Sequence, residues 1–174
     1  DAIVPAVNLM ARQFAHVILP QDWHPPGHAS FASAHPGKKP FETARLAYGE
    51  QVLWPDHCVQ GTRGADLHRD LDVPHAQLII RKGYHAAIDS YSALFEADRE
   101  TPTGLVGYLR QRGLRRLYLA GLATDFCVAW SAVDAGCRCY SSTPAIRTRR
   151  PAPSPRTACS SPATGCGSAR TASS

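Results

Sequence analysis

The 174-residue chain is long enough to bury a sizeable core in one domain and too short for two comfortable ones. It has no run of 18 apolar residues and no charged-then-apolar leader, so we expect a soluble, unexported protein without a membrane partner. The net charge of +5 comes from residues 137–174, which hold six arginines and no acidic residue. The near-neutral remainder gives no reason to expect nucleic-acid binding.

Residues 137–174 also differ in composition from the rest of the chain. They contain mostly Ser, Thr, Pro, Ala, Arg and Cys, and no Leu, Val, Phe, Trp, Lys, Asp or Glu. Such a segment has little to bury and no helical or strand period, which predicts disorder. One interpretation is a basic, phosphorylatable tail. We favour a shifted reading frame, because the change is abrupt, and we predict a domain over 1–136 followed by an out-of-frame tail.

The cysteines follow the same division. Four of the six lie in residues 137–174, which leaves Cys58 and Cys127 in the predicted domain. Two cysteines so far apart do not form a disulfide framework. A reducing cytoplasm is therefore the expected location.

The first predicted elements are a helix and a strand. Residues 1–14 place Ile3, Val7, Met10 and Phe14 on one helical face, with Asp1 as the N-cap. Residues 16–23 predict a buried strand that ends near Pro20. Residues 24–75 are rich in Pro, Gly and His and predict a long irregular excursion, which in a compact domain is usually functional or disordered.

The later elements continue the alternation. Residues 76–83 predict a strand, 103–113 a helix stopped at Gly113, and 115–121 a further strand. A last helix covers 126–136, with Thr124 or Asp125 as its cap. This order predicts an α/β fold, a three-layer αβα arrangement with helices on both faces of a parallel sheet. Ligands of such folds bind beyond the carboxyl ends of the strands, where Asp22, Lys82 and Cys127 all fall.

The stretch "QDWHPPGHASF" offers a set of metal-ligating side chains. Asp22 and His24 point to one side of an extended segment, His28 follows, and "LWPDHCVQGT" supplies His57. A carboxylate with imidazoles suits zinc, iron or manganese. The alternative is a cluster of solvated surface histidines. Cys58 adjoins His57 but points away from it in an extended segment, so we interpret it as a packed thiol.

The stretch "GLATDFCVAW" places Cys127 in the first turn of the last predicted helix. The helix dipole and backbone N–H groups there favour a thiolate and could stabilise an oxyanion. Lys82, at a neighbouring strand end, could add positive charge. The alternatives are a small buried residue for Cys127 and a solvated charge for Lys82. No obvious base for the thiol proton is present, since capping is the expected role of Asp125 and Asp22 is assigned to metal.

Four stretches together resemble the nicotinamidase/pyrazinamidase family of the isochorismatase-like cysteine hydrolases. They are "QDWHPPGHASF", "WPDHCVQGTRGADLH", "IIRKGYHAAIDSYSALF" and "AGLATDFCVAWSAVDA", in the family's order over residues 1–136. The resemblance implies hydrolysis of nicotinamide, or pyrazinamide, through a cysteine thioester in NAD salvage. It also implies a divalent metal cofactor and leaves the oligomeric state open, a homo-oligomer included.

The resemblance implies a role for each matching residue. Lys82 and Cys127 match two members of a catalytic triad, and the N–H groups of Ala123 and Cys127 match an oxyanion hole. The Leu122–Ala123 bond matches a cis peptide. The remaining matches are the metal ligands Asp22, His24 and His57, with His28 as an additional one, and the aromatic substrate walls Trp54 and Tyr91, for which ordinary core packing is the alternative.

The chain departs from the family pattern at both ends. The third triad member, an aspartate on a strand like "VDVQNDF", has no counterpart before Asp1, and the family's βα units are not found after Gly136. We therefore expect a fold lacking the first strand and the C-terminal βα units, and weak or no activity, because a missing base costs roughly 10²- to 10⁴-fold in rate. The alternatives are another amidohydrolase of the superfamily and an inactive fragment.

Overall fold

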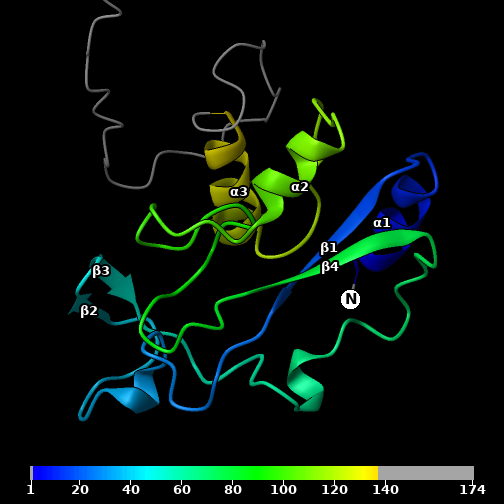
Figure 1. The fold of residues 1–174 in the computed structure, drawn as a ribbon. Coiled ribbons are helices and arrows are strands. Elements are labelled where there is room, and N and C mark those ends of the chain that lie inside the picture. The colour runs from blue at the N-terminus through cyan, green and yellow to red at the C-terminus, as the bar shows by residue number, and fades with distance from the viewer. Residues whose placement is uncertain (1, 137–174) are drawn as a thin grey trace, which may run out of the picture.

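The computed structural model describes residues 2–136 of the chain. The predicted N-cap Asp1 and the predicted disorder of 137–174 lie outside the described residues. The elements, in chain order, are α1 (Val4–Ala11), β1 (Val17–Asp22), the 3-10 helix η1 (Ala32–Ala34), β2 (Thr43–Leu46), β3 (Gly49–Val52), the 3-10 helix η2 (Arg63–Ala65), β4 (Ala76–Lys82), α2 (Leu105–Gln111), the π-helix η3 (Thr124–Val128) and α3 (Ala129–Asp134) (Figure 1).

The central pair of strands is parallel, as predicted. β1 pairs with β4 in a register that sets Ile18 opposite Leu78, Pro20 opposite Ile80 and Asp22 opposite Lys82. Within the described residues β4 is the only partner of β1, and a strand paired on one side tolerates a proline. The strand therefore continues through Pro20 to Asp22 instead of ending at Pro20, and it is half-buried rather than buried.

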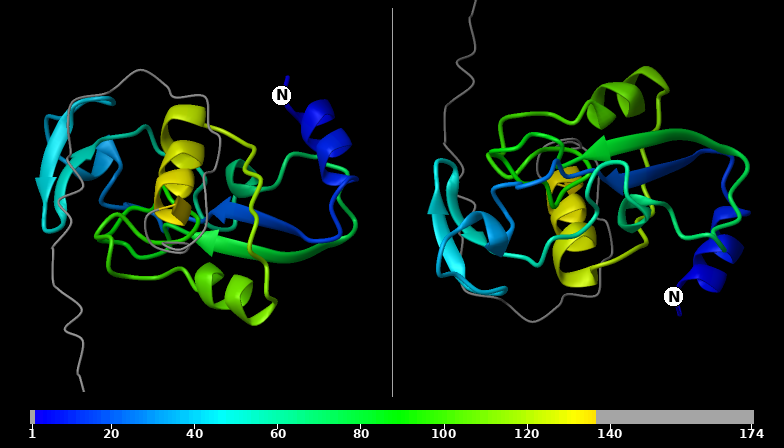
Figure 2. Two further views of the ribbon diagram at one scale, coloured as in Figure 1. Left: turned by 90° about the horizontal axis from the view of Figure 1, so that it is seen from above. Right: turned by 90° about the horizontal axis from the view of Figure 1, so that it is seen from below.

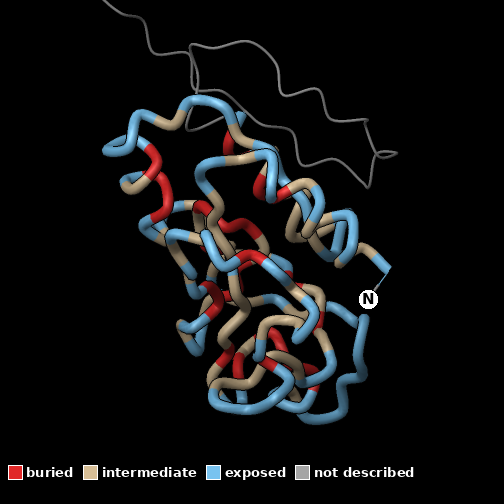
Figure 3. Tube along the Cα trace, turned by 90° about the vertical axis from the view of Figure 1, so that its right-hand side faces the viewer, coloured by how far each residue is buried: buried red, intermediate tan, exposed pale blue. Residues whose placement is uncertain are grey.

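The alternation of side chains along β4 explains where the core and the site lie. Even-numbered residues of β4 are the more buried ones, from Ala76 to Lys82. The core lies between the β1–β4 pair and the helices. The strand side chains Ile18, Leu78 and Ile80 pack against a buried cluster. That cluster includes Leu105, Val106 and Leu109 of α2 and Ala135 just after α3. Figure 1 shows α2 and α3 over the β1–β4 pair, and Figure 3 shows buried segments inside a shell of exposed loops. Lys82 continues the core-facing row to the strand end.

The long excursion over 24–75, predicted to be irregular, contains regular secondary structure. It contains the antiparallel hairpin β2–β3, in which Ala44 pairs with Gln51 and Arg45 with Glu50, and both 3-10 helices. The hairpin lies beyond the carboxyl ends of β1 and β4, while α1 lies at their other end (Figure 2). The hairpin was not predicted from the sequence because its two strands are only four residues long and rich in polar side chains.

Two sequence predictions about the last third of the chain are wrong. Residues 115–121 form no strand, and Tyr118 and Leu119 stay exposed, because an apolar run becomes a strand only where a backbone partner lies beside it. Neither Thr124 nor Asp125 caps a helix, since Ala123 precedes η3 and both residues lie inside its first turn. Among residues 2–136, no helix combines the length and apolar character needed to cross a bilayer.

Candidate active site

A carboxylate and an ammonium lie side by side at the carboxyl ends of β1 and β4. Asp22 and Lys82 are register partners, and their Oδ1 and Nζ atoms are 2.5 Å apart. Lys82 is buried, and its Nζ also donates to the Ser90 carbonyl at 2.6 Å. Burial opposes the charge of the ammonium, but the negative charges of Asp22 and Cys127 outweigh it and raise the pKa of Lys82. Lys82 is therefore a buried, protonated group.

Cys127 lies next to this ion pair. Its Sγ is 3.8 Å from Lys82 Nζ, and the backbone of Ala123 also donates a hydrogen bond to it. The peptide bond between Leu122 and Ala123 is cis, as the family resemblance implies. Sheet register and the η3 turn thus bring together Asp22, Lys82 and Cys127, with the ammonium in contact with both of the others.

The acidity of the Cys127 thiol differs from the sequence expectation. Burial raises its pKa, and Lys82 and the Ala123 hydrogen bond oppose that rise without cancelling it. Cys127 lies near the N-terminus of a helical segment in which η3 runs directly into α3. The expected net lowering of the Cys127 pKa is therefore not found, because burial outweighs Lys82, which is the main group that favours the thiolate.

Three of the predicted metal ligands converge. Ligand atoms of Asp22, His24 and His57 lie within 4.8 Å of one another. His24 is brought against the 57–60 loop by backbone bonds from its N–H to Cys58 O, at 3.0 Å, and from Gln60 N–H to its own carbonyl, at 2.8 Å. The group combines one half-buried carboxylate with two imidazoles.

The hydrogen bonds of two imidazoles leave a lone pair free on each ring. His24 Nδ1–H donates to Gly83 O at 2.8 Å, and His57 Nδ1–H donates to Pro55 O at 2.9 Å, so each Nε2 carries a lone pair. Burial and the neighbouring His28 lower the pKa of His24 to about 4, which keeps the ring neutral near pH 7. A neutral ring with its far nitrogen oriented by a carbonyl is the form in which histidine binds metals.

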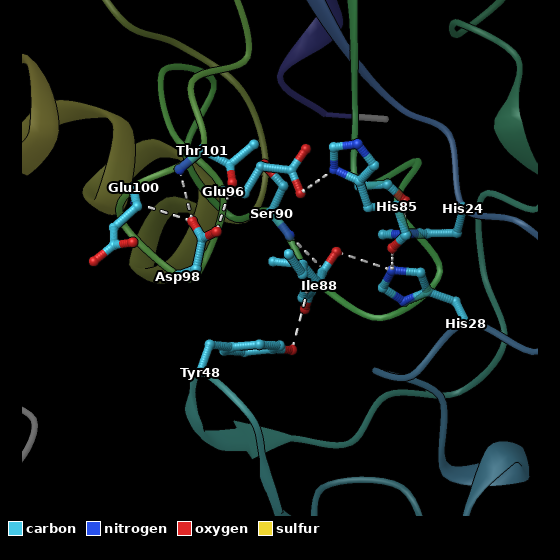
Figure 4. A network of polar contacts seen from close by, with 12 residues as sticks. His24, His28, Tyr48, His85, Ile88, Ser90, Glu96, Asp98, Glu100 and Thr101 are labelled. Atoms are coloured by element: carbon cyan, nitrogen blue, oxygen red, sulfur yellow. Dashed lines mark hydrogen bonds and ion pairs between the residues drawn. The ribbon is translucent and has the colours of Figure 1, made fainter.

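His28 is arranged differently. Its Nε2–H donates to the carbonyls of His85, at 2.9 Å, and Ile88, at 3.2 Å (Figure 4). Its Nδ1 accepts from Ser30 Oγ at 2.8 Å. Ligand atoms of His24, His28 and Asp89 also lie within 4.8 Å of one another. Because both ring nitrogens of His28 are already engaged, we assign it a supporting position beside the three converging ligands.

Aromatic side chains pack against Phe126, the residue before Cys127. Trp54 Nε1 donates to the Tyr91 hydroxyl at 3.0 Å, and their ring centroids are 6.2 Å apart. Phe126, the residue before Cys127, packs at 4.8 Å from Trp54 and 5.4 Å from Tyr91. The two aromatic residues named from the sequence are thus adjacent, and Phe126 joins them.

Cys58 is half-buried, in keeping with a packed thiol. Burial raises its pKa, and the charges of Asp22, Lys82 and Cys127 reach it, so it lies nearer the site than the sequence indicated.

Several residues of the site were not found from the sequence. Gly83 has a positive φ of 65°, and a Cβ there would clash with the ring of His24. A glycine directly after the strand-end Lys82 was the sequence feature that could have indicated this close approach. Phe126 directly precedes Cys127, whereas three others reach the site from segments remote in sequence and no local pattern marks them; these are Gln51, Asp89 and Ser90.

A sequence profile of the isochorismatase domain matches residues 1–143. The chain belongs to the isochorismatase domain family. It is 61% identical over 135 residues to the nicotinamidase of Acinetobacter baylyi, a match over 78% of this chain and 63% of the relative. The chain thus spans less than two thirds of that relative's length.

Solved structures give the same picture. A nicotinamidase/pyrazinamidase structure from Acinetobacter baumanii superposes with a TM-score of 0.77 at 62% identity, covering 78% of this chain and 65% of that one. A Pyrococcus horikoshii pyrazinamidase in complex with zinc superposes with a TM-score of 0.59 at 33% identity, covering 78% and 64%. The α/β fold predicted from the sequence is confirmed.

Proposed function

We propose that the protein is a nicotinamidase, an amidohydrolase that converts nicotinamide and water to nicotinate and ammonia and also accepts pyrazinamide. The observation that carries the proposal is the 3.8 Å approach of Cys127 Sγ to the buried Lys82 ammonium, beside the converging ligands of the metal group. The 61% identity to a relative named nicotinamidase supports the choice of substrate.

Cys127 is the nucleophile in this proposal. Its thiolate attacks the carboxamide carbon, and the developing negative charge on the carboxamide oxygen is received by the backbone N–H groups of Ala123 and Cys127. The C–N bond then breaks, and the nitrogen leaves as ammonia after taking up a proton. A water molecule attacks the resulting thioester, which releases nicotinate and restores the thiol.

Lys82 favours the thiolate through its charge. Its ammonium contacts both Asp22 and Cys127, and because it is already protonated it cannot itself take up the thiol proton. Among residues 2–136, the side chain that contacts Cys127 Sγ is the Lys82 ammonium and not a carboxylate, and Asp22 contacts the other side of that ammonium. We therefore expect slow turnover, because an absent direct base costs roughly 10²- to 10⁴-fold in rate.

Asp22, His24 and His57 would hold a divalent metal ion, which we propose to be zinc, iron or manganese. The Oδ2 atom of Asp22 and the Nε2 atoms of both histidines are the donors left by their other hydrogen bonds, and this donor set fits these metals. When bound, the ion supplies a Lewis acid that orients the pyridine nitrogen. The zinc complex of the Pyrococcus horikoshii pyrazinamidase supports this assignment.

Trp54 and Tyr91 would enclose the pyridine ring. A planar aromatic ligand gains packing energy between ring faces and edges, and the mutually perpendicular rings of Trp54 and Tyr91, at 86°, offer one of each. The unpaired state of the Cys58 and Cys127 thiols supports a reducing, cytoplasmic setting, in which the nicotinate produced would enter NAD salvage.

The test is a product assay on the purified full chain loaded with zinc, iron or manganese. Ammonia and nicotinate should form in equal amounts from nicotinamide, slowly and in proportion to protein, while N-carbamoyl compounds and isochorismate should remain unchanged. Turnover of a carbamoyl compound without turnover of nicotinamide would assign the chain to another activity of the superfamily. Absence of both activities, at every metal and pH tested, would contradict the proposal.

A further inference from the structure

Gln51 of β3 is buried and makes side-chain hydrogen bonds to several elements at once. Its Nε2 lies 2.8 Å from Asp89 Oδ2, 2.9 Å from the Tyr91 hydroxyl and 2.7 Å from Val52 O. Its Oε1 accepts from the Tyr48 hydroxyl at 2.9 Å. The side chain is 2% exposed, so water cannot replace these partners.

The chemistry of the neighbours fixes which way the amide points. The carboxylate of Asp89 only accepts hydrogen bonds, so it must face the NH₂ group. Tyr48 donates to Gln51 Oε1. The Tyr48 oxygen in turn accepts the Asp89 backbone N–H at 3.3 Å (Figure 4). A group with donors on one side and an acceptor on the other is needed here, and neither glutamate nor an apolar side chain provides both.

The same amide reaches the proposed substrate walls. Tyr91 Oη accepts from Gln51 Nε2 and also from Trp54 Nε1 at 3.0 Å. Gln51 and Trp54 belong to the hairpin side of the site, whereas Asp89 and Tyr91 belong to the loop after β4. Gln51 therefore links the two segments that carry the aromatic walls.

Asp89 gives this link a further consequence. It is 3% exposed, and its other oxygen accepts the Ser90 N–H at 2.8 Å. Without the Gln51 amide, a buried carboxylate oxygen of Asp89 and the Tyr91 hydroxyl each lose a donor, which disfavours the observed positions of these two side chains.

We propose that Gln51 is a positioning residue that sets the distance between Trp54 and Tyr91, and through it the affinity for a planar pyridine carboxamide. The inference rests on the proposed function. Gln51 acts through the walls and touches neither Lys82 nor Cys127, so its loss should weaken ligand binding far more than it slows the chemical step.

The test compares Gln51→Met, which keeps the length of the side chain and removes the hydrogen bonds, with Gln51→Glu, which replaces the donor by a second carboxylate facing Asp89. Nicotinamide binding is followed by calorimetry on the metal-loaded full chain, together with KM, kcat and metal content. Both variants should bind nicotinamide about 10-fold more weakly or worse, with Glu the weaker, while kcat stays within about threefold and the metal content is unchanged. Glu50→Gln, at the exposed neighbouring position of β3, is the matched control and should bind like wild type.

The outcomes separate the two proposals. Wild-type affinity and KM in Gln51→Met would overturn the inference alone, as would parallel losses of kcat, metal and affinity, which indicate a merely structural role. Binding of nicotinamide without ammonia release in wild type would contradict the proposed activity and leave the affinity comparison decisive for Gln51. A wild-type protein that does not bind nicotinamide would overturn both.

Discussion

Two parts of the site are assembled in different ways. The reaction side, formed by Asp22, Lys82 and Cys127, depends on the register of β1 against β4 and on the η3 turn. The pocket side, formed by Gln51, Trp54, Asp89 and Tyr91, depends on side-chain hydrogen bonds between the hairpin and the loop after β4. Register is fixed by many backbone bonds, whereas the pocket side depends on a few polar atoms. Substitutions should therefore affect chemistry on the first side and affinity on the second.

The largest effect should come from removing the nucleophile. Cys127→Ala leaves no thiol beside Lys82, and ammonia release from nicotinamide should fall by on the order of 10³-fold or more. Nicotinamide binding by calorimetry should change little, since the pocket side is intact. Cys58→Ala is the matched control and should keep near wild-type turnover. Loss of activity in Cys58→Ala but not in Cys127→Ala would exchange the roles of the two thiols.

Replacing the ammonium should affect both rate and stability. Lys82→Met removes the charge that favours the thiolate and leaves Asp22 unpaired, so turnover should fall roughly 10²- to 10⁴-fold. Breaking a buried ion pair costs about 3–5 kcal/mol, which urea unfolding would measure. The exposed Arg116→Met is the control. Wild-type turnover in Lys82→Met would show that the reaction does not depend on the Lys82 ammonium.

The two buried histidines should respond differently to substitution. His24→Ala removes a proposed ligand and should weaken zinc binding by on the order of 100-fold or more, since even the loss of a supporting partner costs about 10- to 100-fold. His28→Asn removes hydrogen bonds to His85, Ile88 and Ser30, and should mainly lower the free energy of unfolding, by about 1–3 kcal/mol. Equal loss of zinc in both variants, measured by elemental analysis, would make His28 a ligand.

Acid should destabilise the metal-free protein through His24. Its pKa is about 4 in the folded protein and 6.5 unfolded, so between these values the unfolded state binds more protons and stability falls as the pH falls. The full loss is about 3 kcal/mol, reached near pH 4, and it is absent above pH 6.5. Urea unfolding at pH 7 and pH 4.5 measures it, with His24→Gln as the comparison. An equal pH dependence in that variant would assign the effect to other groups.

The reaction side could largely be predicted from the sequence. Apolar runs mark β1 and β4, and the period of two sets Asp22 and Lys82 at the same edge, where they form an ion pair. The position of Cys127 in the last helical segment was also clear, although the effect of burial on its pKa was not. Burial depends on what packs over the thiol, which no local pattern contains.

The pocket side was predicted only in part. The family resemblance named Trp54 and Tyr91, but not Gln51 or Asp89, which join them from positions 38 residues apart. The short polar strands of the hairpin give no periodic signal, and residues 115–121 show the opposite failure, an apolar run that has no strand partner within the described residues. In both cases the outcome depends on contacts between distant segments.

The acidity of Cys127, with and without Lys82, tests the central arrangement most directly and does not depend on turnover. The rate of iodoacetamide alkylation at Cys127 is measured against pH, resolved from the other cysteines by peptide mass spectrometry. Burial should place the wild-type midpoint above the ordinary thiol value of 9.0, and Lys82→Met should move it upward by a further pH unit or so. Identical midpoints in the two proteins would mean that the ammonium and the thiol do not interact, which contradicts the account.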